Sequence, residues 1–326
     1  MSALDGKTIL ITGGTGSFGT RFVELALSEH RPKKLIVFSR DEFKHFTMGQ
    51  RITDPRVRYF IGDVRDLQRL HLAMREVDIV IHAAAMKHVP LAEYNPMECV
   101  RTNIDGAENV VRAALDCKVG KVIALSTDKA TNPINLYGAT KLASDKIFIA
   151  SNALSGTLGT RFAVVRYGNV VGSRGSVIPF FQELLARGTD HLPITDERMT
   201  RFWITLDHGV RFVISALETM QGGELFVPKL PSMRMVDLAR VMAPNLPIKI
   251  IGIRPGEKLH EVMITEDDAR NTIELDDRYV IFPAMPFWTL PERPAGSRPV
   301  PEGFRYSSDN NADWLSDARL RQMMAA

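Results

Sequence analysis

Three glycines spaced three residues apart follow the first apolar run of the chain. Thr8–Thr12 reads as a buried strand, and Phe18–Ser28 shows the periodicity of a helix. Gly13, Gly16 and Gly19 occupy the connection and the first helical turn. Glycines at this spacing let the backbone turn tightly and approach a pyrophosphate, while the N-terminus of the helix supplies amide donors. The pattern predicts a dinucleotide-binding strand, loop and helix.

Apolar runs alternate with amphipathic stretches through the first half of the chain. The runs are apolar throughout, as expected of parallel strands that helices cover on both faces. The predicted strands are Thr8–Thr12, Leu35–Ser39, Val57–Ile61, Asp78–His82, Val122–Ser126 and Phe162–Tyr167. The predicted helices are Phe18–Ser28, Asp66–Arg75, about Met97–Cys117 and about Leu136–Ala153. We therefore expect an α/β fold, a doubly wound parallel Rossmann sheet with a smaller C-terminal α+β region.

The pattern changes after Asn169. Val170–Pro179 is rich in Gly and Ser, and helical periodicity returns at Val177–Arg187, Leu206–Met220 and Met235–Met242. Six prolines between residues 283 and 301 argue against regular helix or sheet there, so this stretch is expected to cover the surface or a neighbouring subunit. We expect a dinucleotide-binding domain at 1–170 with a return segment at 205–228. Residues 171–204 and 229–326 then form a substrate-binding region.

Composition narrows the class of protein. The 41 basic and 38 acidic residues give a formal charge of +3, which does not indicate a nucleic-acid binder. Two cysteines, Cys99 and Cys117, cannot build a disulfide framework. The N-terminus lacks the pattern of an export signal, and no apolar stretch approaches the roughly 20 residues of a membrane span. A soluble cytoplasmic protein is expected.

Charged residues follow the second predicted strand, where such a fold selects its cofactor. An acidic residue there accepts the ribose hydroxyls of NAD, whereas an arginine pairs with the 2′-phosphate of NADP. Ser39 and Arg40 occupy the position, with Lys44 nearby, so we predict NADP; Asp41 keeps NAD open. Further cofactor contacts are expected at Thr15, Ser17, Phe18, Asp63, Val64, Ala83 and Ala84.

Tyr137 and Lys141 are four residues apart in a predicted helix and therefore project from one face. An adjacent ammonium favours a phenolate, so the pair suits a tyrosine that transfers protons near neutral pH. With the glycine motif and Ser126-Thr127 at the end of the preceding strand, the chain resembles the extended short-chain dehydrogenase/reductases. The resemblance implies that Tyr137 is the acid and base, that Lys141 binds the nicotinamide ribose, and that Thr127 bonds the reacting hydroxyl.

Asp128 and Lys129 follow Thr127 directly. Oxidation or 4-epimerisation of a sugar needs only the tyrosine and the cofactor, whereas elimination of water needs two further proton-transfer groups. An ordinary ion pair that caps the loop is an equal reading of the spacing. Residues 127–133, Thr-Asp-Lys-Ala-Thr-Asn-Pro, resemble the branch of sugar-nucleotide 4,6-dehydratases that acts on UDP-N-acetylglucosamine.

The resemblance extends to the short inverting UDP-N-acetylglucosamine 4,6-dehydratases of pseudaminic acid biosynthesis and weakens only near 283–301. Its other segments are Ala83–Pro90, Tyr94–Cys99, Arg166–Ser176, Leu192–Trp203 and Ser307–Asn311. It implies a hydro-lyase in which Lys129, if its pKa is lowered, takes the proton from carbon 5 while Asp128 assists loss of the 6-hydroxyl. A retaining 4,6-dehydratase, a 4-epimerase and a non-catalytic NADP sensor stay open as alternatives.

The same resemblance suggests how the substrate, UDP-N-acetylglucosamine, is held. Lys87 and Asn169 are expected to contact cofactor and substrate, and Thr127 and Tyr137 to contact the sugar. Candidates for the rest of the substrate are Val170, Arg174, Ser176, Val177, Thr195, Arg201, Arg254 and Glu257. For each arginine a solvated surface charge is the alternative. No metal is expected. The resemblance also implies a homo-oligomer formed through helices 97–117 and 136–153.

Overall fold

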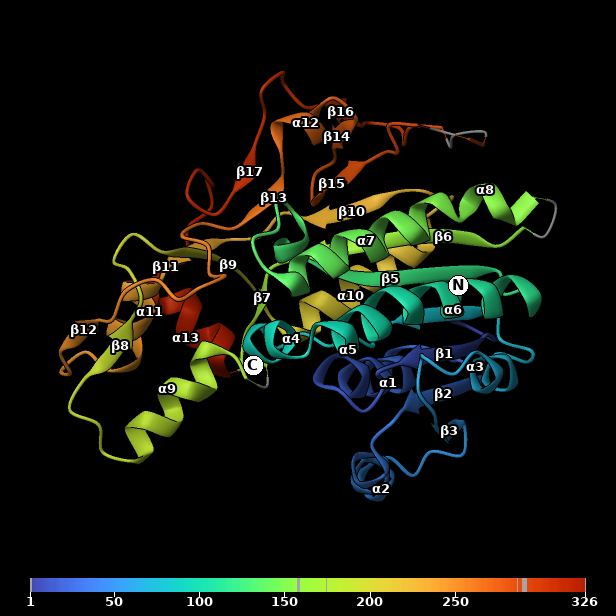
Figure 1. The fold of residues 1–326 in the computed structure, drawn as a ribbon, viewed down its shortest axis with the longest axis horizontal. Coiled ribbons are helices and arrows are strands. Elements are labelled where there is room, and N and C mark those ends of the chain that lie inside the picture. Colours follow the sequence, from blue (N-terminus) through green and yellow to red (C-terminus); the bar gives the residue numbers. More distant parts are fainter. Residues whose placement is uncertain (1, 157–158, 174, 286, 289–291, 326) are drawn as a thin grey trace.

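A ten-stranded sheet organises the chain (Figure 1). The structure, a computed structural model, describes residues 2–156, 159–173, 175–285, 287–288 and 292–325. The strand order is β16-β14-β15-β10-β6-β5-β4-β1-β2-β3. The parallel strands are β1 (Thr8–Thr12), β2 (Lys34–Ser39), β3 (Val57–Ile61), β4 (Ile79–His82), β5 (Lys121–Thr127), β6 (Arg161–Tyr167) and β10 (Leu225–Pro228). The order reverses between β1 and β4, which confirms the predicted doubly wound sheet and opens a crevice at their carboxyl ends.

Helices pack in two rows against the sheet. The first row comprises α3 (Leu67–Ala73), α6 (Gly106–Asp116) and α7 (Leu136–Ala150), and the second α1 (Ser17–Glu29) and α10 (Leu206–Thr219). In Figure 1, α6 and α7 lie in front of the sheet and α10 behind it. Arg21 of α1 binds Asp207 of α10 at 2.6 Å. Covered on both faces, β1 is fully buried, as its unbroken apolar pattern predicted.

The predicted helix near Met97–Cys117 is interrupted. It consists of α5 (Pro96–Val100), a π-helical turn (Arg101–Asp105) and α6. The turn seats Asn103, which is buried and bonds both backbone groups of Met86 at 2.8 and 3.0 Å. Helical periodicity in the sequence does not predict such a π-helical turn, because the turn depends on a contact with another segment of the chain. The helices that were not predicted include α2 (Glu42–Arg51) and α4 (Val89–Tyr94) in the first half of the chain, and α12 (Glu266–Ala269) and α13 (Asp317–Ala325) in the second.

The later half of the chain builds a smaller region with its own apolar core around Trp203 and Phe181. Its helices are α9 (Val177–Ala186), α11 (Met235–Met242) and α13 (Asp317–Ala325). Its strands are β7 (Asn169–Val170), β8 (Leu192–Ile194), β9 (Thr200–Ile204), β11 (Ser232–Arg234) and β12 (Ile248–Ile250). A further pair, β13 (Val262–Ile264) and β17 (Tyr306–Ser307), follows with α12 (Glu266–Ala269).

The large sheet includes strands from the later half of the chain. Residues 205–228 contribute β10 to it and α10 to the helices that cover it. Residues assigned to the substrate-binding region also extend its edge as antiparallel β14 (Thr272–Glu274), β15 (Arg278–Ile281) and β16 (Arg298–Pro299). The expectation that prolines exclude regular structure at 283–301 is therefore wrong for β16. An edge strand tolerates Pro299 because one side of it needs no ladder bond. Pro286 and Pro291 lie outside the described residues.

No helix within the described part of the chain is long and apolar enough to cross a membrane.

His82 joins β4 to β1 in the buried centre of the sheet, with Nδ1 2.9 Å from Thr12 Oγ1. Burial, helped by the charge of Lys141, lowers its pKa from 6.5 to about 3. Below pH 6.5 the unfolded chain therefore binds a proton that the folded protein excludes, so the free energy of unfolding decreases as the pH is lowered. From pH 6.5 to pH 5 this histidine alone should lower the free energy of unfolding by about 2 kcal/mol.

The measurement that checks this is thermal unfolding of wild type and His82→Asn at both pH values. The amide keeps a partner for Thr12 but does not titrate, so the variant should lose less stability on acidification. An equal loss in the two proteins would contradict the assignment.

Candidate active site

A cavity of about 600 Å³ opens at the carboxyl ends of the parallel strands and reaches the start of the smaller region. Nearly all of the predicted cofactor contacts line it. They are Gly13, Thr15, Gly16, Ser17, Phe18, Gly19, Ser39, Arg40, Lys44, Val64, Ala83, Ala84, Lys87, Tyr137, Lys141 and Asn169. Asp41 and Asp63 are not among its lining residues.

The glycine loop needs its glycines for close packing. A Cβ on Gly19 would lie 2.4 Å from the Cα of Gly14, and one on Gly13 would lie 2.9 Å from the backbone nitrogen of Ala84. Gly13 also has a φ of 67°. The loop can therefore run against the end of β4 only without side chains. This leaves the N-terminus of α1 open to the cavity, which suits an anionic pyrophosphate.

The residues after β2 place cations at one end of the cavity. Arg40 and Lys44 line it, and Thr15 Oγ1 donates to Ser39 Oγ at 2.9 Å. Asp41 instead begins α2: its carboxylate accepts from the backbone nitrogen of Lys44 and pairs with Lys44 Nζ at 2.8 Å. Asp63 pairs with Arg65 at 2.8 Å and lies 3.6 Å from Arg40. The two carboxylates thus contact neighbouring side chains in this structure, and their contact with the cofactor stays a prediction.

Tyr137 lies in the first turn of α7 with its ring in the cavity wall. Burial raises the pKa of its phenol to about 12, while Lys129 and a hydrogen bond with Thr127 act in the opposite direction. Lys141, one turn further on, is buried, and burial lowers its pKa against the pull of Asp145. Lys129 is therefore a cation that favours the phenolate, and the same role for Lys141 stays a prediction.

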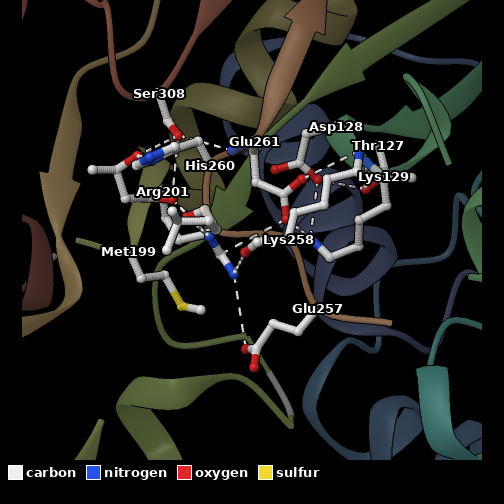
Figure 2. A network of polar contacts seen from close by, with 12 residues as sticks. Thr127, Asp128, Lys129, Met199, Arg201, Glu257, Lys258, His260, Glu261 and Ser308 are labelled. Atoms are coloured by element: carbon white, nitrogen blue, oxygen red, sulfur yellow. Dashed lines mark hydrogen bonds and ion pairs between the residues drawn. The ribbon is translucent and has the colours of Figure 1, made fainter. Parts of the chain in front are cut away.

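Lys129 lines the cavity between two buried carboxylates (Figure 2). Its Nζ lies 3.0 Å from Asp128 Oδ1 and 3.4 Å from Glu261 Oε1. Burial would lower the pKa of the amine, but the two carboxylates outweigh it and raise the pKa above its ordinary value. The condition set for Lys129 as a base, a lowered pKa, is thus not met in the free protein, because the two carboxylates outweigh burial and the neighbouring Arg201.

Gly138 fixes the distance between α7 and the loop that carries Lys129. A Cβ at this position would lie 2.1 Å from the carbonyl oxygen of Lys129. Asn135 caps α7 by accepting from the Gly138 nitrogen at 2.8 Å and donates to the carbonyl of Gly256 at 2.8 Å. The start of α7 is therefore packed directly on the loop 127–131 and tied to the segment near Gly256.

The predicted substrate residues separate into two groups. Lys87, Thr127, Tyr137, Asn169, Val170 and Ser176 line the cavity. Val177, Thr195, Arg201, Arg254 and Glu257 do not. Arg254 forms an exposed pair with Glu257 at 2.9 Å, and Thr195 donates to Met199 Sδ at 3.1 Å. Arg174 lies outside the described residues.

Arg201, which was predicted to bind the nucleotide, is buried and supports a loop in this structure. Its guanidinium donates to the carbonyls of Thr200, Leu259 and Lys258 at 2.7, 3.1 and 2.9 Å. Local sequence could not show the contacts with Leu259 and Lys258, because these residues are distant from Arg201 in the chain.

Several residues of the site were not predicted. The cavity is also lined by Phe38, Gly62, Ala85, His88, Thr102, Leu125, Ser126, Tyr167, Gly168, Ser173, Gly175 and Leu206. Glu261 pairs with Lys129 at 3.4 Å and with Lys258 at 3.7 Å. The only signal of Glu261 and Lys258 was their place in the segment after Arg254 and Glu257. Among the residues that the structure describes, no three His, Cys, Asp or Glu side chains are grouped to hold a metal ion.

Comparison with known proteins gives consistent relatives. A family model described as "Polysaccharide biosynthesis protein" matches residues 9–283. A UDP-N-acetylglucosamine 4,6-dehydratase (inverting) from Campylobacter jejuni is 57% identical over 324 residues, 98% of this chain and 97% of that protein.

Solved structures show the same fold. Pen from Bacillus thuringiensis superposes with a TM-score of 0.91 at 38% identity, covering 99% of this chain and 98% of that one. DesIV, a dTDP-glucose 4,6-dehydratase from Streptomyces venezuelae with NAD and TYD bound, has a TM-score of 0.69 at 24% identity, covering 77% and 86%.

Proposed function

The chain belongs to the polysaccharide biosynthesis protein family, and we propose that it is a hydro-lyase that dehydrates UDP-N-acetylglucosamine across carbons 4 and 6 with inversion at carbon 5. The product is a UDP-linked 4-keto-6-deoxy-L-sugar. The relative from Campylobacter jejuni, which is named for this activity, matches nearly the whole chain.

One feature of the geometry carries the proposal: a single cavity contains the glycine loop, Tyr137 and the amine of Lys129. An epimerase needs only the first two, whereas dehydration needs an additional acid and base. Lys129 and Asp128, joined by a 3.0 Å hydrogen bond, supply them.

The residues divide the proton transfers among themselves. Bound NADP would supply the oxidation at carbon 4 and the later reduction at carbon 6, without net consumption. Tyr137 first loses its own proton to become a phenolate, the form that Lys129 and Thr127 favour. The phenolate then accepts the proton of the 4-hydroxyl, to which Thr127 bonds. The resulting ketone acidifies the proton on carbon 5.

The Asp128–Lys129 pair then completes the elimination. In the free protein the proton is on Lys129, so it first passes along the 3.0 Å bond to Asp128. The neutral amine takes the carbon-5 proton, and Asp128 gives its proton to the leaving 6-hydroxyl, which departs as water. The ammonium and the carboxylate are thereby restored. When carbon 6 is reduced, carbon 5 takes up a proton on the face opposite to its original hydrogen, which balances the proton that Tyr137 accepted.

The product formed from UDP-N-acetylglucosamine tests this function. Proton NMR should show a new methyl group and an L-configured 4-keto sugar. A product that keeps its 6-hydroxyl would identify a 4-epimerase, and a D-configured keto sugar a retaining dehydratase. NADP binding without turnover would identify a sensor; each of these results would overturn the proposal.

We further propose NADP as the preferred nicotinamide cofactor, supported by Arg40 and Lys44 in the cavity wall and by the pairing of Asp41 with Lys44. Arg40→Ala should weaken NADP binding about tenfold or more and change NAD binding less than about threefold, since only NADP carries the 2′-phosphate. Calorimetric titration with both cofactors checks this. Arg58→Ala, a change to an exposed arginine on β3, serves as the control; equal losses for both cofactors in Arg40→Ala would contradict the assignment.

We also propose that the protein works as a homo-oligomer, as predicted from sequence. Leu91, Tyr94 and Met97 on α4 and α5 are exposed apolar side chains that another subunit could cover. The mass of the native protein in solution tests this.

A further inference from the structure

Glu261 is a buried carboxylate whose backbone is fixed but whose side chain is in contact with the site. Glu261 immediately precedes β13. Its backbone nitrogen donates to Ser308 Oγ at 2.9 Å, which fixes the backbone at this position. Its carbonyl in turn accepts from the Ser308 nitrogen at 2.8 Å. The side chain is 2% exposed and does not line the cavity. Glu261 therefore contacts the site from outside the cavity, with its backbone held by Ser308.

Its carboxylate contacts three cations from separate elements. Oε1 lies 3.4 Å from Lys129 Nζ and 3.8 Å from Arg201 Nε, and Oε2 lies 3.7 Å from Lys258 Nζ. Oε2 is buried without a hydrogen bond. Lys129 is the only one of these three cations that lines the cavity. The anion thus acts on the reaction through Lys129.

The charges that face Lys129 come from four directions. Asp128 belongs to its own turn, Glu261 and Lys258 to the segment before β13, and Arg201 to β9. The phenol of Tyr137 faces it from α7. The carboxylates of Asp128 and Glu261 attract Nζ of Lys129, while the cations of Arg201 and Lys258 repel it. Without Glu261, one attraction would oppose two repulsions.

We propose that Glu261 is the positioning residue of Lys129: from outside the cavity, its carboxylate holds the amine on the cavity wall in its protonated form. The inference rests on the proposed function for the reaction that Lys129 serves, but its central claim concerns Lys129 alone. Lys258, which pairs with Glu261, links its own segment to the loop 127–131 by donating to the carbonyl of Thr131.

The test measures how fast an amine-reactive acylating reagent modifies Lys129 in the full-length protein loaded with NADP. Mass spectrometry quantifies Lys129 relative to exposed Lys146. Only the neutral amine reacts, so at about pH 9 Glu261→Gln should accelerate modification of Lys129 about tenfold, the effect of lowering its pKa by about one unit. Glu261→Asp, which keeps the charge, should stay closer to wild type and serves if the glutamine variant folds poorly.

Glu224→Gln is the matched control, because Glu224 is a buried carboxylate away from the cavity. It should leave the modification rate of Lys129 unchanged. Turnover gives the second readout: Glu261→Gln should lower kcat about tenfold, because the amine loses its position on the cavity wall. KM should stay within about twofold, because Glu261 does not touch substrate.

An unchanged rate of Lys129 modification in both Glu261 variants, or an equal acceleration in Glu224→Gln, would overturn the inference. A rise in KM with kcat preserved would also overturn it, because it would place Glu261 in substrate binding. If wild type does not dehydrate UDP-N-acetylglucosamine but the modification contrast persists, the proposed function fails and the role of Glu261 stands.

Discussion

Tyr137→Phe is expected to reduce turnover of UDP-N-acetylglucosamine by about 10²- to 10⁴-fold, since the phenol is the group proposed to accept the 4-hydroxyl proton. Loss of that transfer stops the first oxidation, so no later step can proceed. The ring stays in place and the fold should be preserved. Single-turnover absorbance of the reduced nicotinamide at its characteristic wavelength, together with product NMR, measures the effect.

Tyr94→Phe provides the control because Tyr94 is 85% exposed on α4. It removes the same hydroxyl from the surface and should retain full turnover. A Tyr137→Phe variant with more than about a tenth of wild-type activity would show that another group takes this proton.

Lys129→Met is expected to abolish dehydration and also to destabilise the protein. The variant lacks the amine that takes the carbon-5 proton, so product should fall by about 10²-fold or more, and deuterium from heavy water should not enter carbon 5. The change also leaves Asp128 and Glu261 buried without their shared cation, at a cost of about 3 kcal/mol. Denaturant unfolding measures the stability loss.

Two further variants separate these effects. Lys146→Met, on the exposed face of α7, should change neither quantity. Lys129→Met combined with Glu261→Gln removes one unpaired charge and should regain part of the stability without regaining activity. Full stability in the single variant would mean that the ion pairs contribute nothing, and deuterium at carbon 5 would mean that Lys129 is not the base.

Local pattern was sufficient for the parts of the site that lie on regular elements. The glycine loop and the Tyr137 helix follow from spacings within a few residues, and the structure places both in the cavity. The charged residues were harder to interpret. Asp41 and Arg201 were predicted as ligand contacts, and the structure adds that Asp41 caps α2 and that Arg201 supports a loop distant in the chain. Whether a charge faces a ligand, a helix end or a carbonyl depends on what folds against it.

The sequence by itself determined the doubly wound sheet, the dinucleotide loop and the presence of Tyr137, Thr127 and Lys129 at strand and helix ends, because periodicity and short spacings encode these directly. Only the tertiary structure decided the charge of Lys129. Burial and the adjacent Asp128 act most strongly on its pKa, and Glu261, which is far away in the chain, adds to the effect of Asp128 only after β13 docks beside the loop 127–131. Coulomb interactions fall with distance in space rather than along the sequence, so no local pattern contains them.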